Sequence, residues 1–226
     1  MFNRIVLSAF LAGSIAGVLL SVIQIFWVTP LILEAETYEV SSTAIAGEIE
    51  SAEEAWAPED GWERTLYTTG SNIVIAFGFA IILTGFYNLF HFSKLYQGLA
   101  WGIAGYLAFF VSPALGLPPE LPGTVAADLV DRQYWFLGTV FCTAIGLMLV
   151  FLSSKWLLRL IGAFLVVMPH LIGAPQPLKH ESLAPHSLIT QFIWASSLSN
   201  ALFWIALGTL SLVLFRFFSP LQPADR

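Results

Sequence analysis

A group of carboxylates follows the first long apolar segment of the chain. Glu34, Glu36 and Glu39 lie within residues 29–39, shortly after Pro30. If this stretch is helical, Glu36 and Glu39 share one face at an i,i+3 spacing, and Glu34 is rotated away from them. Paired carboxylate oxygens can bind a hard or borderline divalent cation. A solvated acidic helix face has the same spacing, so both interpretations stay open.

Three of the four histidines gather in residues 170–186. They are His170, His180 and His186, and His170 directly follows Pro169 near the end of an apolar segment. Imidazole suits cobalt, nickel, copper and zinc, and carboxylates can complete the coordination shell. A histidine at the edge of a membrane needs a polar partner, and the structural alternative is a helix-end histidine bonded to the backbone. The predicted metal ligands are Glu34, Glu36, Glu39, His170, His180 and His186.

Six apolar stretches must position these residues. Five of them contain no Asp, Glu, Lys or Arg, and the other contains only Arg159. About 20 apolar residues in a helix cross a hydrocarbon core of about 30 Å. Hydrophobic residues make up 57% of the chain and charged residues 11%. We therefore predict an all-α fold, a polytopic transmembrane helical bundle. The stretches are residues 5–28, 67–90, 95–117, 134–152, 157–174 and 188–215.

The basic residues favour six spans with both termini in the cytoplasm. In that topology six Lys and Arg residues are cytoplasmic and three lie outside the cytoplasm. If residues 157–174 did not span, five would be cytoplasmic and four would lie outside. Five spans remain the alternative. The first segment is too long for a signal peptide, and we expect it to be retained as an anchor. The six are Arg4, Lys94, Lys155, Arg159, Arg216 and Arg226, and the three are Arg64, Arg132 and Lys179.

Acidic residues are distributed unevenly. In the six-span topology, 14 of the 15 Asp and Glu residues lie outside the cytoplasm, and only Asp225 lies inside. Residues 29–66 hold ten of them and are predicted to form an acidic extracytoplasmic loop between the first two spans. The whole chain, residues 1–226, is predicted to be a single membrane domain. Its extracytoplasmic surface should be strongly anionic.

The motifs of soluble enzymes are missing from the sequence. There is no Walker-type loop, Rossmann fingerprint or nucleophile elbow. We predict that the protein is not an enzyme, holds no permanent cofactor, contacts the lipid bilayer and binds no nucleic acid. Because no soluble domain is large enough to hydrolyse ATP, transport would be passive, driven by an ion gradient or the membrane potential, or powered by another subunit. Gly13 and Gly17, like Gly98 and Gly102, are predicted to pack helices within the chain.

Three motifs resemble those of the CbtA family of predicted cobalt transporter subunits. They are residues 29–39, the Arg-Gln-Tyr-Trp run at 132–135, and the Pro-His-Leu-Ile-Gly-Ala-Pro-Gln-Pro run at 169–177. The resemblance implies a multi-pass protein of the prokaryotic inner (plasma) membrane, usually with five spans. It implies uptake of Co²⁺ for cobalamin supply, together with a small one-span CbtB-like subunit that has a histidine-rich tail. Carried over by motif, the implied site residues are Glu34, Glu36, Glu39 and His170, whereas His180 and His186 rest on chemistry.

Two functions follow from these patterns. The first is a membrane subunit for uptake of a divalent metal, cobalt by resemblance, in which the acidic outer face captures the cation. The second is a membrane scaffold or assembly partner that transports nothing, with the acidic loop docking another protein. The scaffold is favoured by the lack of ionisable residues deep within most spans, where ion paths often carry one.

Overall fold

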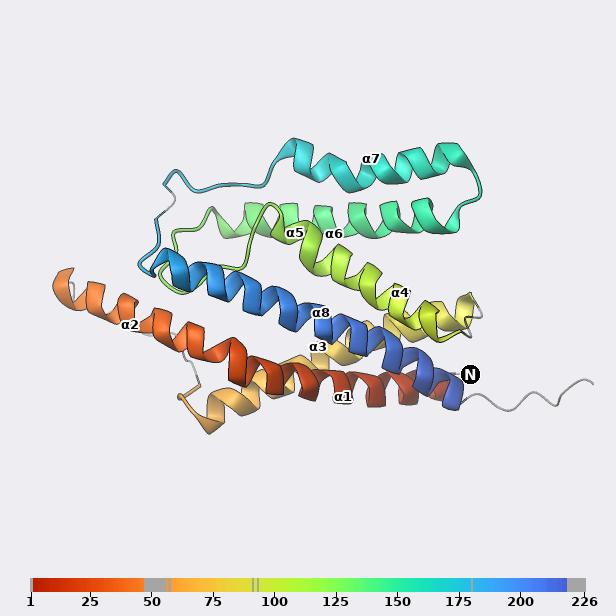
Figure 1. Cartoon of the computed structure of the whole chain (residues 1–226), viewed down its shortest axis with the longest axis horizontal. Helices are drawn as coiled ribbons and strands as arrows, with labels where there is room; N and C mark the ends of the chain where they lie inside the picture. Colours follow the sequence, from red (N-terminus) through yellow and green to blue (C-terminus); the bar gives the residue numbers. More distant parts are fainter. Residues whose placement is uncertain are drawn as a thin grey trace, which may run out of the picture. The chain divides into compact units, whose positions relative to one another are not determined.

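The computed structural model describes residues 2–46, 56, 58–90, 92, 94–179 and 181–218 (Figure 1). Helices account for 80% of the structure. The described residues form no β-strand, and their one β-bridge joins Thr124 to Ser182. The prediction of an all-α fold is confirmed.

The helices follow one another with short connections. α1 ends at Trp27, and α2 begins two residues later, so the helix prediction for the stretch after Pro30 is confirmed. Proline is tolerated there because the first turn of a helix does not use its N–H groups. The elements are α1 (Phe2–Trp27), α2 (Thr29–Ala46), α3 (Trp62–Leu89), α4 (Leu95–Tyr106), the π-helix η1 (Leu107–Val111), α5 (Ser112–Ala114), α6 (Leu129–Leu152), α7 (Trp156–Ile172) and α8 (His186–Phe217).

Five helical segments among the described residues are long and apolar enough to cross a membrane. They are α1, α3, the continuous run Leu95–Ala114, α6 and α8. The sixth apolar helix, α7, has 17 residues, somewhat short of the roughly 20 that a span needs. It ends early because Gly173, with φ at 87°, turns the chain out of the helix. The six-span count and the cytoplasmic location of both termini stay predictions.

Contacts group the chain into two compact units, and the prediction of a single membrane domain is not tested by this grouping. Unit 1 comprises Met1–Ile23, Ala57–Ile103 and Ala201–Arg226, and unit 2 comprises Gln24–Trp56 and Ala104–Asn200. The division falls within α1, α4 and α8. Each unit is described by itself.

Unit 1 is held together by close helix contacts. A Cβ atom added at Gly13 or Gly17 would lie 2.6–2.7 Å from the backbone of Phe77 or Ile73 on α3, and one at Gly102 would lie 2.4 Å from the Trp204 carbonyl oxygen on α8. Side chains of normal size do not fit at these distances. The predicted packing of these glycines within the chain is confirmed.

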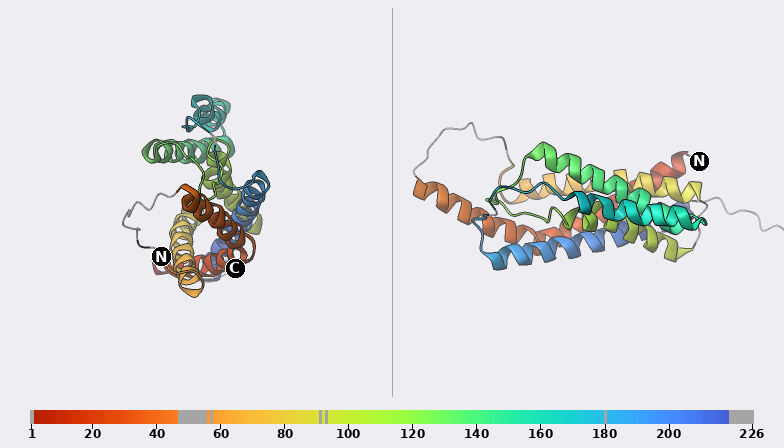
Figure 2. Two further views of the ribbon diagram at one scale, coloured as in Figure 1. Left: turned by 90° about the vertical axis from the view of Figure 1, so that its left-hand side faces the viewer. Right: turned by 90° about the horizontal axis from the view of Figure 1, so that it is seen from above.

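Unit 2 contains the antiparallel pair α6 and α7, which lie side by side (Figures 1 and 2). Gly146 and Gly162 meet at their centre, where a Cβ added to either would lie 2.6 Å from the carbonyl oxygen of the other. A separate apolar cluster forms where α2, the loop before α6 and the start of α8 meet. Its buried members are Val28, Ala35, Leu121, Ala184, Leu188 and Phe192.

Candidate functional site

The helix that begins at Leu95 changes from an α-helix to a π-helix before it ends. Residues Leu107–Val111 form the π-helix η1, and the backbone N–H of Ser112 donates to the carbonyl of Leu107, five residues earlier. Pro113 follows, and it has no N–H to offer the preceding turn. Such wide turns occur often at functional sites. Here the irregular turn brings the buried Ser112 side chain to α6 and α7.

A chain of polar side chains joins three helices at this point. The hydroxyl oxygen of Ser112 lies 2.8 Å from the Thr143 hydroxyl on α6 and 3.1 Å from Nε2 of His170 on α7. Ser112 and Thr143 are buried, and His170 is half-buried. In apolar surroundings these hydrogen bonds satisfy hydroxyl and imidazole groups that water does not hydrate. His170 therefore has the polar partner that its position required, and that partner is a side chain rather than the backbone.

Residues of the 169–177 motif also bond to the neighbouring elements. Trp135 Nε1 donates to the carbonyl of Pro169 at 3.3 Å, and its ring meets that of His170 edge-on with centroids 6.0 Å apart. Gln176 donates to the carbonyl of Gly116 at 3.1 Å. A Cβ at Gly116 would lie 2.4 Å from the Trp135 ring. The motif thus ties the end of α7 to the start of α6 and to the loop after α5.

The loops beside this junction carry a second set of polar links. The guanidinium of Arg132 lies 2.7 Å from a carboxylate oxygen of Glu120, with both side chains about a quarter exposed (27% each). The hydroxyls of Thr124 and Ser182 are 3.0 Å apart, and Val125 N–H donates to the Glu181 carbonyl. These contacts fix the loop after α5 against α6 and against the loop after α7.

The structure places the predicted metal ligands on different elements. Glu34 and Glu39 are exposed on α2, and Glu36 is half-buried there. His186 is exposed as the first residue of α8. His180 lies outside the described residues. In the part of the chain that the structure describes, no three His, Cys, Asp or Glu side chains come together as a metal site. The ligand set stays a prediction.

The partners of His170 were not anticipated from the sequence. Ser112 and Thr143 lie inside apolar stretches and are 31 residues apart. A serine followed by a proline within a span was the one available signal for Ser112, because proline disturbs the helix there. Nothing local distinguishes Thr143 from a threonine that bonds to its own helix.

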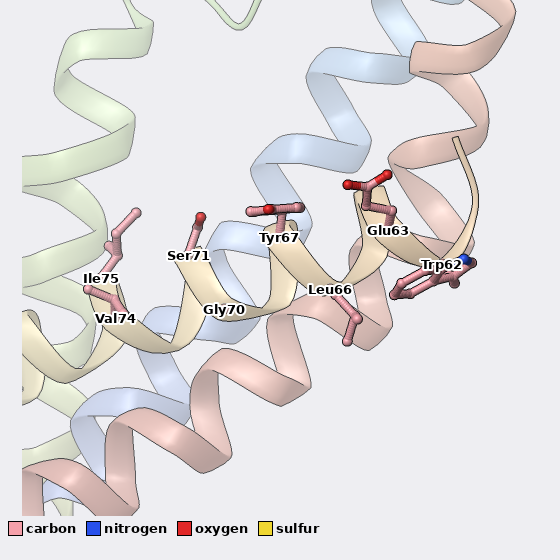
Figure 3. A pocket seen from close by; sticks show the side chains of 8 residues that line it. All are labelled: Trp62, Glu63, Leu66, Tyr67, Gly70, Ser71, Val74 and Ile75. Carbon is pink, nitrogen blue, oxygen red and sulfur yellow. The ribbon is translucent and has the colours of Figure 1, made fainter. Parts of the chain in front are cut away.

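A hollow of about 710 Å³ lies along α3 in unit 1 and contains none of the predicted ligands (Figure 3). A single charged side chain, Glu63, lines it; the rest of its wall is mostly apolar. Because all of its walls belong to one helix, it has no second surface to enclose a small ligand. Its lining residues are Trp62, Glu63, Leu66, Tyr67, Gly70, Ser71, Val74 and Ile75.

Long apolar helices with polar links between them define a multi-pass α-helical membrane protein. The family model CbtA, described as a probable cobalt transporter subunit, matches residues 2–216, and the chain belongs to this family. The family description is of a transport subunit rather than of an enzyme. A search of curated proteins and a search of solved structures each find no match to this chain.

Proposed function

We propose that the chain is the integral membrane subunit of a transporter that takes up a divalent metal, Co²⁺, captured on an acidic outer face. Membership of the probable cobalt transporter subunits carries this proposal. The apolar helices support it, because five of them are long enough to cross a membrane. Co²⁺ is the substrate, and the protein acts in the prokaryotic inner membrane without catalysing a reaction.

The acidic residues of α2 and of residues 47–66 would collect cations at the outer face. A strongly negative surface raises the local concentration of a dication. The half-buried Glu36 and exposed Glu39, three residues apart on α2, are the proposed first oxygen ligands, with Glu34 beside them. His170, His180 and His186 are the proposed nitrogen ligands. An inside-negative potential then favours entry by about 2.3 kcal/mol per charge for each 100 mV.

The word subunit in the family description implies a partner. We propose that this partner is a small one-span CbtB-like protein whose histidine-rich tail receives or delivers the metal. Imidazoles on the partner would complete a shell that the described residues of this chain do not complete alone.

The scaffold function is the second candidate, and one observation favours it. Nε2 of His170 is already bonded to Ser112, which a purely structural histidine would also show. On this view His170 holds α7 in place, and the carboxylates of α2 dock another protein.

Uptake of radioactive cobalt by a host that lacks its own cobalt transporter tests the two functions. The chain is expressed alone and with its companion subunit, and variants are verified for membrane insertion. Uptake that requires the chain and falls about tenfold or more in Glu36→Gln and His170→Ala supports the transporter. Asp131→Asn, an exposed carboxylate on α6 outside the proposed ligand set, is the matched control and should retain uptake.

His170→Gln separates the two roles of the histidine. A glutamine amide can still bond to Ser112, but it is a poor ligand for cobalt. Loss of uptake in a well-folded His170→Gln protein identifies a metal ligand. Full uptake in that variant assigns His170 to structure, and no uptake in any pairing of subunits contradicts the transporter.

A further inference from the structure

Two arginines from different helices lie at the same end of unit 1. Nε of Arg4, near the start of α1, donates to the carbonyl of Phe215 at 2.9 Å. The guanidinium carbon of Arg4 also lies 3.6 Å from the centre of the Phe215 ring. Arg216 directly follows Phe215 in the last turn of α8. Because these contacts hold Arg4 against the end of α8, Arg4 and Arg216 belong to one small region of the unit.

The contact between α4 and α8 brings a third basic residue to this end. A Cβ atom added at Gly98 would lie 3.0 Å from Cβ of Leu212, and the next turn of α4 contacts an earlier turn of α8, so the two helices run antiparallel. Residues four apart share a helix face. One turn beyond this contact are Lys94, directly before α4, and Arg216 on α8. Figures 1 and 2 show the starts of α1 and α4 and the end of α8 at the same end of unit 1.

The acidic residues of unit 1 that the structure describes lie at its other end. They are Glu59, Asp60 and Glu63, at or just before the start of α3, whereas α4 follows the end of α3 after a short turn. Asp60 pairs there with Arg64. None of the ion pairs among the described residues involves the basic residues of α1, α4 or α8. Positive charge is therefore concentrated where no described carboxylate balances it.

A structural role explains only one of the three basic residues. Arg4 bonds to a carbonyl in the last turn of α8, as basic side chains often do at the end of a helix. Lys94 and Arg216 are exposed and add like charge beside it. Like charges at one place raise the energy of the folded protein unless an anion lies between them. A guanidinium has five N–H donors, and the bond from Arg4 to Phe215 uses one.

The surroundings of these residues indicate the kind of anion. α1, the run Leu95–Ala114 and α8 are all candidate membrane spans, and the three basic residues lie at their ends. Tyr96, with its ring centre 6.0 Å from Nζ of Lys94, is 62% exposed, and tyrosine is enriched where spans reach the lipid headgroups. Phe2 and Phe217 are each 76% exposed beside them. Basic groups between the ends of membrane helices recognise anionic headgroups, and arginine suits phosphate.

We infer that Arg4, Lys94 and Arg216 form a binding site for the headgroup phosphate of an anionic phospholipid. The phosphate oxygens accept hydrogen bonds from the two guanidinium groups and the ammonium group, and the acyl chains lie against the exposed apolar side chains of the spans. The bound headgroup offsets the repulsion between the three cations and links the ends of α1, α4 and α8. This inference goes beyond the proposed function and does not depend on cobalt.

Lipid retention by the full chain tests the site directly. Protein in mild detergent is equilibrated with equal amounts of phosphatidylglycerol and phosphatidylcholine of the same acyl chains, and bound lipids are counted by native mass spectrometry. We expect phosphatidylglycerol to be retained about fivefold or more over phosphatidylcholine. Equal retention of the two lipids would overturn the inference.

Three variants locate the preference. Lys94→Gln combined with Arg216→Gln removes two charges and leaves the bond from Arg4 to α8, so the retention ratio should fall towards one. Lys94→Arg keeps the charge and should keep the ratio. Arg64→Gln, at the other end of unit 1, is the matched control and should also keep it. A ratio that survives the double substitution, or that falls equally in Arg64→Gln, would contradict this site.

Thermal unfolding in detergent distinguishes a lipid from free phosphate. Phosphatidylglycerol should raise Tm saturably, by about 3 °C or more relative to phosphatidylcholine, in the natural protein and in Arg64→Gln but not in the double variant. Because salt screens exposed charges, the rise should shrink at high NaCl concentration. An equal rise with inorganic phosphate would assign the site to a free anion and overturn the lipid assignment. A rise that is insensitive to NaCl would contradict recognition by charge.

Discussion

The α1–α3 contact of unit 1 and the α6 contacts of unit 2 both depend on glycines. They differ in the hydrogen bonding of the polar side chains that lie near them. Next to Gly17, the Asn72 amide of α3 donates to the Ser21 hydroxyl of α1, which itself donates to the carbonyl of Gly17. We call this link closed because each of its hydrogen-bond donors has an acceptor. On α6, the helix that also carries Gly146, Thr143 bonds to Ser112, which in turn bonds to His170 of α7. The buried Thr139 hydroxyl of α6 has no hydrogen-bond partner among the described residues.

The difference lies in the regularity of the helices. α1 and α3 are unbroken where they touch, so their backbone groups are satisfied within each helix. The partners of α6 are a π-helix followed by Pro113, and a helix with Pro169 in its last turn. The polar links of α6 lie where its partner helices are interrupted, as expected in a solvent that cannot hydrate backbone groups. Regular helices also bury polar groups, because Ser8 of α1 and Ser211 of α8 are fully buried and their hydroxyl oxygens have no hydrogen-bond partner among the described residues.

The largest effects are expected at the shared feature, the packed glycines. Gly17→Leu and Gly146→Leu place side chains where a Cβ alone would lie 2.7 and 2.6 Å from the backbone of another helix. Since overpacking against rigid backbone is costly, each should lose about 3 kcal/mol of stability or fail to fold. The measurement is the monodisperse fraction after extraction, followed by unfolding in detergent.

Gly138→Leu on α6 is the control, because nothing lies within 4 Å of a Cβ built there. It should be close to neutral. If Gly17→Leu or Gly146→Leu is as stable as Gly138→Leu, the helix contact at that glycine is not tight. Close packing at glycine would then not be common to the two units.

A smaller effect is expected from the two shortest ion pairs among the described residues, one in each unit. Arg132 and Glu120 in unit 2 are each 27% exposed, whereas Asp60, the partner of Arg64 in unit 1, is 70% exposed. Because solvent screens the second pair more strongly, double-mutant cycles with Gln and Asn should give couplings of about 1 kcal/mol for the first pair and about 0.3 kcal/mol for the second. Equal couplings would mean that the loops of unit 2 are no better fixed than the exposed start of α3.

Much of the helix framework could be predicted from the sequence, because the cost of exposing polar backbone to lipid allows few solutions for long apolar segments. The packing of Gly13 and Gly17 was readable from their spacing of four residues. Residues 157–174 were predicted as one apolar stretch, and the helix within it ends at Ile172 because Gly173 adopts a positive φ. That position of the glycine reflects backbone geometry rather than hydropathy.

The candidate site was only partly predictable. His170 was singled out because an imidazole at a membrane edge needs a partner, but the identity of that partner depends on a contact across 58 residues. The π-helix has the sequence Leu-Ala-Phe-Phe-Val, which is as apolar as its surroundings. The environment of Thr139 and Thr143 depends on the helices that pack against them. No local sequence pattern predicts those contacts.

The smallest predicted effect concerns the closed polar link of unit 1. Asn72→Leu removes the amide that donates to Ser21, but the Ser21 hydroxyl keeps its bond to the Gly17 carbonyl. Nothing buried is therefore left without a partner in that link, and we expect a coupling of about 0.6 kcal/mol between Asn72 and Ser21, the average for such bonds in a membrane protein. A double-mutant cycle with Ser21→Ala, measured by unfolding in detergent, gives the value. A coupling several times larger would place an energetically important polar contact between two regular helices, and helix interruption would no longer set the polar links of α6 apart.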